Sequence, residues 1–367
     1  MSYDQSLPPR MRKQAAKPPK AAPPRKPRRI GRIVLAFLAI VIVALASYAG
    51  YLYVKANQNI TKVADPDASS VPKDQLAESK PISLLLLGMD TREETGSMNT
   101  DVIMTAIFNP KTKTATVVSV PRDSDLNLDG YKTRKANAYY ARFLSIARTE
   151  ENLSGDGARK YANEQMRSMM EKFFGGIKID YTAILDFKGF VDVVDALGGV
   201  NVYVDQDMRY WDKADGTDID LQKGDQKLDG EGALGFVRYR KSRNGETAPS
   251  SDFARNDRQD RVLGAIVDKL KSFGSVTKIG NVMDAVGDNV KTDIPKEQIQ
   301  NMISTYFGIS RQNVRFIALT GEWKSPYVYL DQAKLEEAKQ ALQEEMQPEG
   351  RAITSAAPQE TAAAGSE

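Results

Sequence analysis

Charged residues, together with one glutamine, stand at the ends of apolar segments in two parts of the chain, and their types suit phosphate chemistry. The first group contains Asp90, Arg92, Asp101, Arg122 and Asp123, and the second contains Arg238, Arg240, Arg255, Arg258 and Gln259. Carboxylates hold hard cations such as Mg²⁺ through oxygen. Arginine forks bind phosphate oxygens in pairs. Together, the two groups predict a site for a substrate rich in phosphate charge.

The composition removes several kinds of catalyst. The 367 residues include no Cys and no His. Thiol catalysis, disulfides and thiolate metal sites are therefore excluded, and so are the commonest general base and the commonest transition-metal ligand. Any catalysis must depend on carboxylates, Tyr, Lys, Arg, Ser or Thr, or on a cation bound by oxygen.

The first group gathers if its strands pair as their sequences indicate. Residues 82–87 read as a buried strand, and 102–108 and 114–120 read as a hairpin across 109–113. The hairpin puts Asp101 and Arg122 at the same end of neighbouring strands. If the first strand runs parallel to 114–120, Asp90, Arg92 and Asp123 reach that edge too, where ligands of open α/β sheets bind. In the alternative, Asp90 and Asp101 are turn and cap residues paired with Arg92 and Arg122.

The second group shows two kinds of spacing. Arg238 and Arg240 point to the same side if their segment is extended. Arg255 and Gln259 lie four residues apart on a helix expected over 253–273. Arg255 falls in its first turn, where the helix favours anions. The alternative is a solvated face of salt bridges with Asp252, Asp257 and Asp260.

Alternating elements predict an α/β fold, a three-layer α/β/α sandwich around a mixed central sheet. Further helices are expected over 157–174 and 187–197, and further strands over 177–185, 200–204 and 314–319. Met166, Met169 and Met170 recur at helical spacing. They are expected in the core, with an apolar groove for a lipid tail as the alternative, because Met packs adaptably.

The N-terminal part predicts one transmembrane helix before this domain. Residues 1–32, a tail expected to be disordered, carry ten Lys or Arg and one acid, a charge of +9 that leaves −6 for the rest of a chain of net charge +3. Residues 33–54 are uncharged and long enough to span a bilayer. The basic residues before them place the N-terminus in the cytoplasm and the domain outside the cell membrane. A cleaved signal peptide is the alternative, but its apolar core is usually shorter.

The remaining boundaries follow from composition. Residues 55–80 are expected to form a polar linker, 81–345 the extracellular catalytic domain, and 346–367 a disordered tail.

Eight short motifs, in this order, resemble the LytR-CpsA-Psr family. The resemblance covers roughly residues 80–287. It rests on Leu-Leu-Gly-Met-Asp-Thr-Arg (86–92), Thr-Asp (100–101), Val-Ser-Val-Pro-Arg-Asp (118–123), Lys-Ala-Asn-Ala-Tyr (135–139), Val-Asp-Ala-Leu-Gly-Gly-Val (194–200), Leu-Asp-Gly-Glu-Gly-Ala-Leu (228–234), Val-Arg-Tyr-Arg-Lys (237–241) and Arg-Asn-Asp-Arg-Gln (255–259).

The resemblance implies a phosphotransferase of cell wall biogenesis. Such enzymes move a glycopolymer (teichoic acid, capsule or arabinogalactan) from a polyprenyl-pyrophosphate carrier to a peptidoglycan sugar hydroxyl, and the product is a phosphodiester.

The family's residue roles carry over by position. Asp90 and Asp101 would hold Mg²⁺, or Mn²⁺ in its place. Arg92, Arg122, Arg238, Arg240, Arg255 and Gln259 would bind the pyrophosphate. Asp123 and Arg258 would support them, and Asp90 or Asp101 would serve as the general base.

Two features leave alternatives open. Asn99 stands where the family often has an arginine, so Arg92 or Arg134 is expected to compensate unless the substrate contact differs. Residues 242–252 read as a mobile loop, either a lid or a plain surface loop.

Three other functions remain as alternatives. A pyrophosphatase could use the same site with water as acceptor. A non-catalytic polyprenyl-phosphate binding module would need the arginines more than the two carboxylates. A transcriptional attenuator would need a DNA-reading module, but the tail has no helix-turn-helix pattern and the domain is net acidic.

Overall fold

The computed structural model describes residues 64, 70–92, 97–213, 216–272, 282 and 289–351. In these residues no helix is long and apolar enough to cross a membrane. The expected transmembrane segment 33–54 and the tail 1–32 lie outside them, as does the end of the chain from residue 352 onward.

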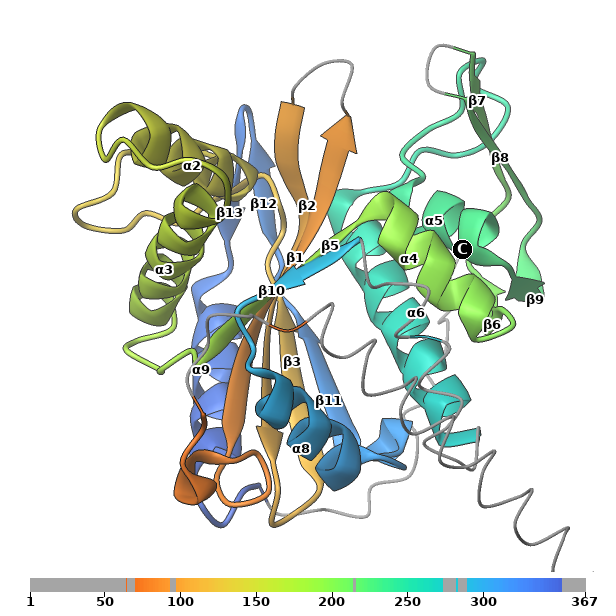
Figure 1. The fold of residues 1–367 in the computed structure, drawn as a ribbon. Helices are drawn as coiled ribbons and strands as arrows, with labels where there is room; N and C mark the ends of the chain where they lie inside the picture. Colours follow the sequence, from red (N-terminus) through yellow and green to blue (C-terminus); the bar gives the residue numbers. More distant parts are fainter. Residues whose placement is uncertain are drawn as a thin grey trace, which may run out of the picture. The chain divides into compact units, whose positions relative to one another are not determined.

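A mixed six-stranded sheet forms the centre of the domain, in the order β10-β5-β1-β2-β3-β11 (Figure 1). β1 is antiparallel to β2, which is antiparallel to β3, so β1 and β3 run parallel, and β5 and β11 are parallel to their neighbours β1 and β3. The strands are β1 (Ile82–Arg92), β2 (Ser97–Asn109), β3 (Thr114–Ser119), β5 (Tyr181–Asp186), β10 (Val290–Thr292) and β11 (Val314–Ala318). The predicted hairpin and mixed sheet are confirmed.

Helices cover both faces of this sheet (Figure 1). On one face lie α2 (Tyr139–Thr149), α3 (Gly155–Phe173) and α9 (Gln332–Met346), whose apolar residues share one core. Toward the other face lie α4 (Phe187–Ala196), α5 (Gly230–Arg238), α6 (Asp252–Ser272) and α8 (Lys296–Tyr306).

Small sheets and single turns complete the domain. A three-stranded sheet contains β12 (Gly321–Lys324), β13 (Tyr327–Leu330) and β4 (Ser124–Asp125). Two hairpins pair β6 (Val200–Val204) with β9 (Gly224–Leu228), and β7 (Met208–Asp212) with β8 (Thr217–Leu221). The 3-10 turns are η1 (Lys73–Gln75), η2 (Ala136–Ala138) and η3 (Arg311–Asn313).

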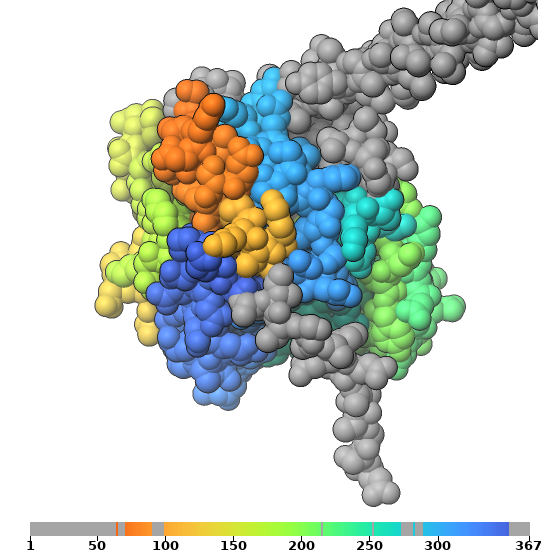
Figure 2. All heavy atoms as spheres, turned by 90° about the horizontal axis from the view of Figure 1, so that it is seen from below, coloured from red at the N-terminus to blue at the C-terminus, as the bar shows by residue number. Residues whose placement is uncertain are grey.

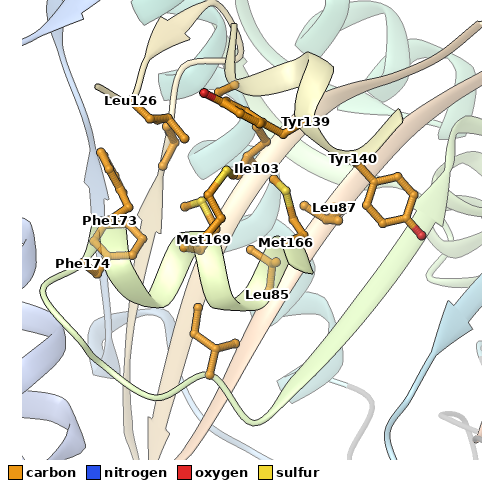
Figure 3. Packing of buried hydrophobic residues seen from close by; sticks show 14 of the residues in the cluster. Leu85, Leu87, Ile103, Leu126, Tyr139, Tyr140, Met166, Met169, Phe173 and Phe174 are labelled. Carbon is orange, nitrogen blue, oxygen red and sulfur yellow. The ribbon is translucent and has the colours of Figure 1, made fainter. Parts of the chain in front are cut away.

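The methionine stripe of α3 packs directly on the sheet. Met166, Met169 and Met170 have no exposed surface and belong to the same core as Leu85 and Ile103 of the strands. Figure 3 shows Met166 and Met169 between the helix and these strand residues. The expectation that this stripe is core is confirmed, and burying such side chains contributes about 2 kcal/mol each.

Ordered structure begins before residue 81. The backbone N–H of Ala77 donates to Oε1 of Gln298 over 3.1 Å, and the Tyr306 hydroxyl donates to the Ala77 carbonyl over 3.2 Å. Seen from below, the segment of residues 72–80 lies beside α8 (Figure 2). Residues 72–80, within the expected linker, therefore pack against α8.

Candidate active site

A pocket of about 270 Å³ opens at the end of the sheet where the parallel strands β1, β3 and β5 finish. It is lined by Asp101, Val102, Arg122, Phe187, Val237, Arg238, Arg240, Arg255, Asn256 and Gln259. Six of these are predicted site residues, drawn from both sequence groups. Four guanidinium groups and one carboxylate leave the lining strongly positive, as a site for a phosphate-rich group requires.

Asp101 reaches the pocket through an irregularity in the sheet. Gly88 pairs with Val102 and Met89 pairs with Thr100, so Asp101 is an extra residue with no partner on β1. A bulge of this kind re-aims a side chain. Gly88 makes the close approach feasible, because a Cβ at this position would lie 2.8 Å from the Val102 Cβ.

Arg122 is held from several directions. Its Nη1 donates to Oδ1 of Asp101, and its Nε lies 3.7 Å from Oδ2 of Asp123. The nearly buried Asp123 also pairs with Lys135 Nζ over 2.8 Å, and the Arg122 carbonyl accepts the backbone N–H of Asn137 over 2.9 Å. Lys135 and Asn137, both in the sequence motif at residues 135–139, therefore help to hold Arg122 in position.

The backbone around Arg238 and Arg240 corrects one sequence argument. Arg238 is the last residue of α5 rather than part of an extended strand, and Arg240 follows in a loop. Both side chains nevertheless line the pocket. The Arg238 guanidinium lies 4.4 Å from the centre of the Phe187 ring, the first residue of α4, and a cation on an aromatic face is attracted to it.

Arg255 and Gln259 line the pocket from one side of α6, as their spacing predicted. Burial, followed by the charges of Arg122 and Arg240, lowers the pKa of Arg255 to about 9, and Asp123 and Asp101 only partly oppose this shift. Arg255 remains a cation at neutral pH, but its charge is destabilised. An anion in the pocket would relieve that destabilisation.

Arg258 does not line the pocket. Its guanidinium is fully buried and forms a fork with Asp205, from Nε to Oδ1 over 2.7 Å and from Nη2 to Oδ2 over 2.6 Å. Nη1 donates to the Ser250 hydroxyl over 2.8 Å and to the Tyr239 carbonyl over 3.3 Å. Burial by itself would raise the pKa of Asp205, but the hydrogen bonds and charge of Arg258 hold it below its usual value. Arg258 thus ties α6 to the segment that carries Arg240.

Two predicted site residues near the carboxyl end of β1, Asp90 and Arg92, are placed by their backbone only. Asp90 pairs with Asn99 and Arg92 pairs with Ser97 beside the bulge, and their side chains lie outside the described part. Asn99 is exposed, and neither it nor Arg134 lines the pocket.

The donor chemistry around Asp101 fits a magnesium ion. Mg²⁺ prefers one or two carboxylates together with substrate phosphates and water. Asp101 lines the arginine-rich pocket. The pairing of β1 with β2 brings the backbone of Asp90 to the same edge of the sheet. Among the described residues there is no group of three or more His, Cys, Asp or Glu side chains placed to hold a metal ion.

Residues 242–251 form a loop that is tied to the domain, and residue 252 of the expected loop already belongs to α6. The Tyr239 hydroxyl and Thr247 Oγ1 lie 2.5 Å apart, and the Tyr239 hydroxyl also donates to the Ala248 carbonyl over 3.1 Å. The backbone N–H of Ser250 donates to the carbonyl of Arg240 over 2.6 Å. These bonds hold the backbone of Arg240 at the pocket.

Sequence reasoning missed four residues of the lining. Val102, Phe187 and Val237 supply apolar walls, and Asn256 supplies an amide. Val102 and Val237 are direct neighbours of Asp101 and Arg238, and Asn256 follows Arg255 within the last motif. Only Phe187 had no signal, because it comes from a helix far from both charged groups in sequence.

Comparison with known proteins identifies the family of this chain. The model of the LytR_cpsA_psr family matches residues 50–346, most of the chain. The chain belongs to this family. Polyisoprenyl-teichoic acid–peptidoglycan teichoic acid transferase TagT of Bacillus subtilis (strain 168) is 32% identical over 342 residues, which are 88% of this chain and 96% of TagT.

Solved structures of the family agree with the fold. B. subtilis TagV is 28% identical with a TM-score of 0.57, over 73% of this chain and 97% of TagV. The structure of TagT bound to LI-WTA is 31% identical with a TM-score of 0.52, over 73% of this chain and 91% of that one. The α/β domain with a mixed central sheet is therefore the fold of this family.

Proposed function

We propose that this chain transfers a glycopolymer of the teichoic acid type from a polyprenyl-pyrophosphate carrier to a sugar hydroxyl of peptidoglycan. The observation that carries the proposal is the convergence of Arg122, Arg238, Arg240 and Arg255 on one pocket with Asp101. The matched relative TagT is named for the corresponding transfer, which supports the same reaction class here.

The reaction requires little covalent chemistry from the protein. The acceptor hydroxyl oxygen forms a bond to the phosphorus that carries the glycopolymer, and the bond from this phosphorus to the bridging oxygen breaks. Polyprenyl phosphate leaves, and the hydroxyl proton passes to a carboxylate, for which Asp101 and Asp90 are the candidates. The arginines hold the pyrophosphate and stabilise the charge that develops on the leaving phosphate.

Magnesium, held by Asp90 and Asp101, would neutralise phosphate charge and polarise the reacting phosphoryl group when bound. Mn²⁺ would serve in the same place. We further propose that residues 33–54 span the cell membrane, with the N-terminus in the cytoplasm and the pocket outside, where lipid carrier and peptidoglycan meet.

The test uses the full-length chain in detergent, wild type and Arg238→Ala. Each is incubated with a polyprenyl-pyrophosphate-linked glycan, Mg²⁺ and peptidoglycan oligomers, and mass spectrometry detects the phosphodiester product. We expect product from the wild type that EDTA abolishes, and a loss of at least 100-fold in Arg238→Ala, since a transition-state charge contact contributes roughly 3 kcal/mol.

Other products would point to other functions. Free polyprenyl phosphate and glycan phosphate without conjugate would identify a pyrophosphatase instead. Product that survives both EDTA and Arg238→Ala would contradict the proposed site.

A further inference from the structure

Asn256 lies in the pocket wall, and the Nδ2 of its amide has no hydrogen-bond partner among the described residues. Only 7% of its surface is exposed, and it lines the pocket between Arg255 and Gln259. Its Nδ2 is fully buried and finds no hydrogen-bond acceptor among the described residues. A buried donor left without an acceptor is costly, and native proteins retain few of them.

The surroundings of Asn256 explain why the protein itself does not supply the acceptor. Four of the polar side chains on the pocket wall are arginines, which carry donors only. The one carboxylate of the described lining, Asp101, is already paired with Arg122. In the described structure the Nε of Arg122 is likewise buried without a hydrogen bond, and Oδ2 of Asp123 lies 3.7 Å from it. The described wall therefore has more donors than acceptors, and an anionic ligand in the pocket would supply the acceptor that Nδ2 of Asn256 lacks.

We infer that the Asn256 amide donates a hydrogen bond to a phosphate oxygen of the lipid-linked pyrophosphate. The inference rests on the proposed function and adds a residue to that site. Helix α6 would then present three donors to one substrate group, namely Arg255, Asn256 and Gln259. Asn256 differs from the arginines because it is neutral and short, so it fixes the position of the oxygen without adding to the crowding of positive charge.

Three variants of the full-length chain in detergent separate this role from a packing role. Asn256→Ala removes the amide. Asn256→Asp keeps its shape but replaces the donor by a negative charge. Asn201→Ala is the matched control, an asparagine exposed on β6 outside the pocket. For each we measure kcat and KM for transfer, the affinity for inorganic pyrophosphate by calorimetry, and Tm.

We expect Asn256→Ala to lower kcat/KM about 10- to 100-fold, the range of a hydrogen bond to a charged group. Asn256→Asp should lose more, because a carboxylate repels phosphate, and both should bind pyrophosphate more weakly. Asn256→Ala should not lower Tm, since it removes an unsatisfied buried donor and Ala is also the better helix former. Asn201→Ala should behave as wild type.

Opposite results would overturn the inference. If Asn256 only fills space, Asn256→Ala loses activity in parallel with Tm and binds pyrophosphate with wild-type affinity. Unchanged pyrophosphate affinity in both variants would also exclude the contact. If the wild type itself transfers no glycan, the proposed function fails, and the pyrophosphate titrations alone then decide whether Asn256 contacts the anion.

Discussion

At the scale of single residues, the pocket wall and helix α6 carry groups that lower the stability of the ligand-free protein. The Arg255 cation is buried beside two other arginines, and the Nδ2 of Asn256 lacks an acceptor in the described structure. One turn beyond Arg255, burial, followed by the charge of Asp257, raises the pKa of Asp260 to about 7, and Arg311 only partly offsets this. Functional sites commonly keep such unfavourable groups at a cost in stability.

Asp260 gives a pH-dependent prediction. Its pKa is above the unfolded value of 3.8, so the folded state holds the proton more tightly. The ionised carboxylate thus destabilises the fold, and this penalty grows from about pH 4 and is complete above pH 7. We expect Asp260→Asn to stabilise the protein, by roughly 2 kcal/mol more at pH 8 than at pH 5. Urea unfolding at both pH values measures the difference.

The control for this prediction is Asp268→Asn, an exposed position about two turns further along the same helix, whose charge is not among the causes of the Asp260 shift. It should show no comparable gain at pH 8. If Asp260→Asn destabilises at pH 8, attraction to Arg311 outweighs burial, and the sign assigned to Asp260 is wrong.

At the scale of elements, the bulge between β1 and β2 determines where Asp101 points. An ideal antiparallel register would give every residue of β2 a partner, and side chains beyond the shift would change faces. The extra residue and the close pairing of Gly88 with Val102 instead bring both Asp101 and Val102 to the pocket. The position of the carboxylate therefore depends on a glycine in the neighbouring strand.

Gly88→Ala tests that dependence. The new Cβ would meet the Val102 Cβ at 2.8 Å and its Cγ2 at 2.9 Å, so the strand must shift. We expect a stability loss of about 1–3 kcal/mol and at least a tenfold fall in transfer rate, because Asp101 moves with Val102. The double variant Gly88→Ala/Val102→Gly, which removes both the clashing Cβ and the clashing Cγ2, should recover part of both.

The comparison for this variant is Gly157→Ala on α3, where the nearest atom to a new Cβ is 3.7 Å away. It should be neutral or slightly stabilising in stability and neutral in activity. Transfer at the wild-type rate in Gly88→Ala would show that the register of Asp101 is unimportant.

At the scale of the whole domain, the pocket joins two separately packed parts. Asp101 comes from β2 and Arg122 from the turn after β3. Arg238, Arg255 and Gln259 come from α5 and α6, which pack with β6–β9 in their own core. The buried fork of Arg258 and Asp205 lies within the second part and fixes α6 against the segment after β6. The relative position of the arginines depends on that fork.

Breaking the fork should cost stability first. Arg258→Met leaves Asp205 without its partner, and loss of one member of a buried pair typically destabilises by about 3 kcal/mol or more. Urea unfolding should show this loss at pH 7, and Arg258→Met/Asp205→Leu should recover part of it. A variant Arg258→Met of wild-type stability that no longer binds pyrophosphate would instead make Arg258 a direct phosphate ligand.

Much of this protein follows from its sequence by itself. Apolar runs and glycine pairs predicted strands β1, β2, β3, β5, β6 and β11 and helices α3, α4 and α6, because periodicity of hydrophobic residues reports local burial. Strand ends in a mixed sheet predicted that Asp101 and Arg122 meet, and the spacing of Arg255 and Gln259 predicted a shared helix face; the structure has both.

Only the tertiary structure decided which charged residues line the pocket. Arg258 belongs to the same motif as Arg255, yet it turns to Asp205, 53 positions away in sequence. Phe187 and Asn256 joined the pocket, and Arg238 reached it from a helix end instead of a strand. Residue type and spacing fix what a side chain can bind, but its partner is set by which distant segments packing brings within a few ångströms, and that information is not local.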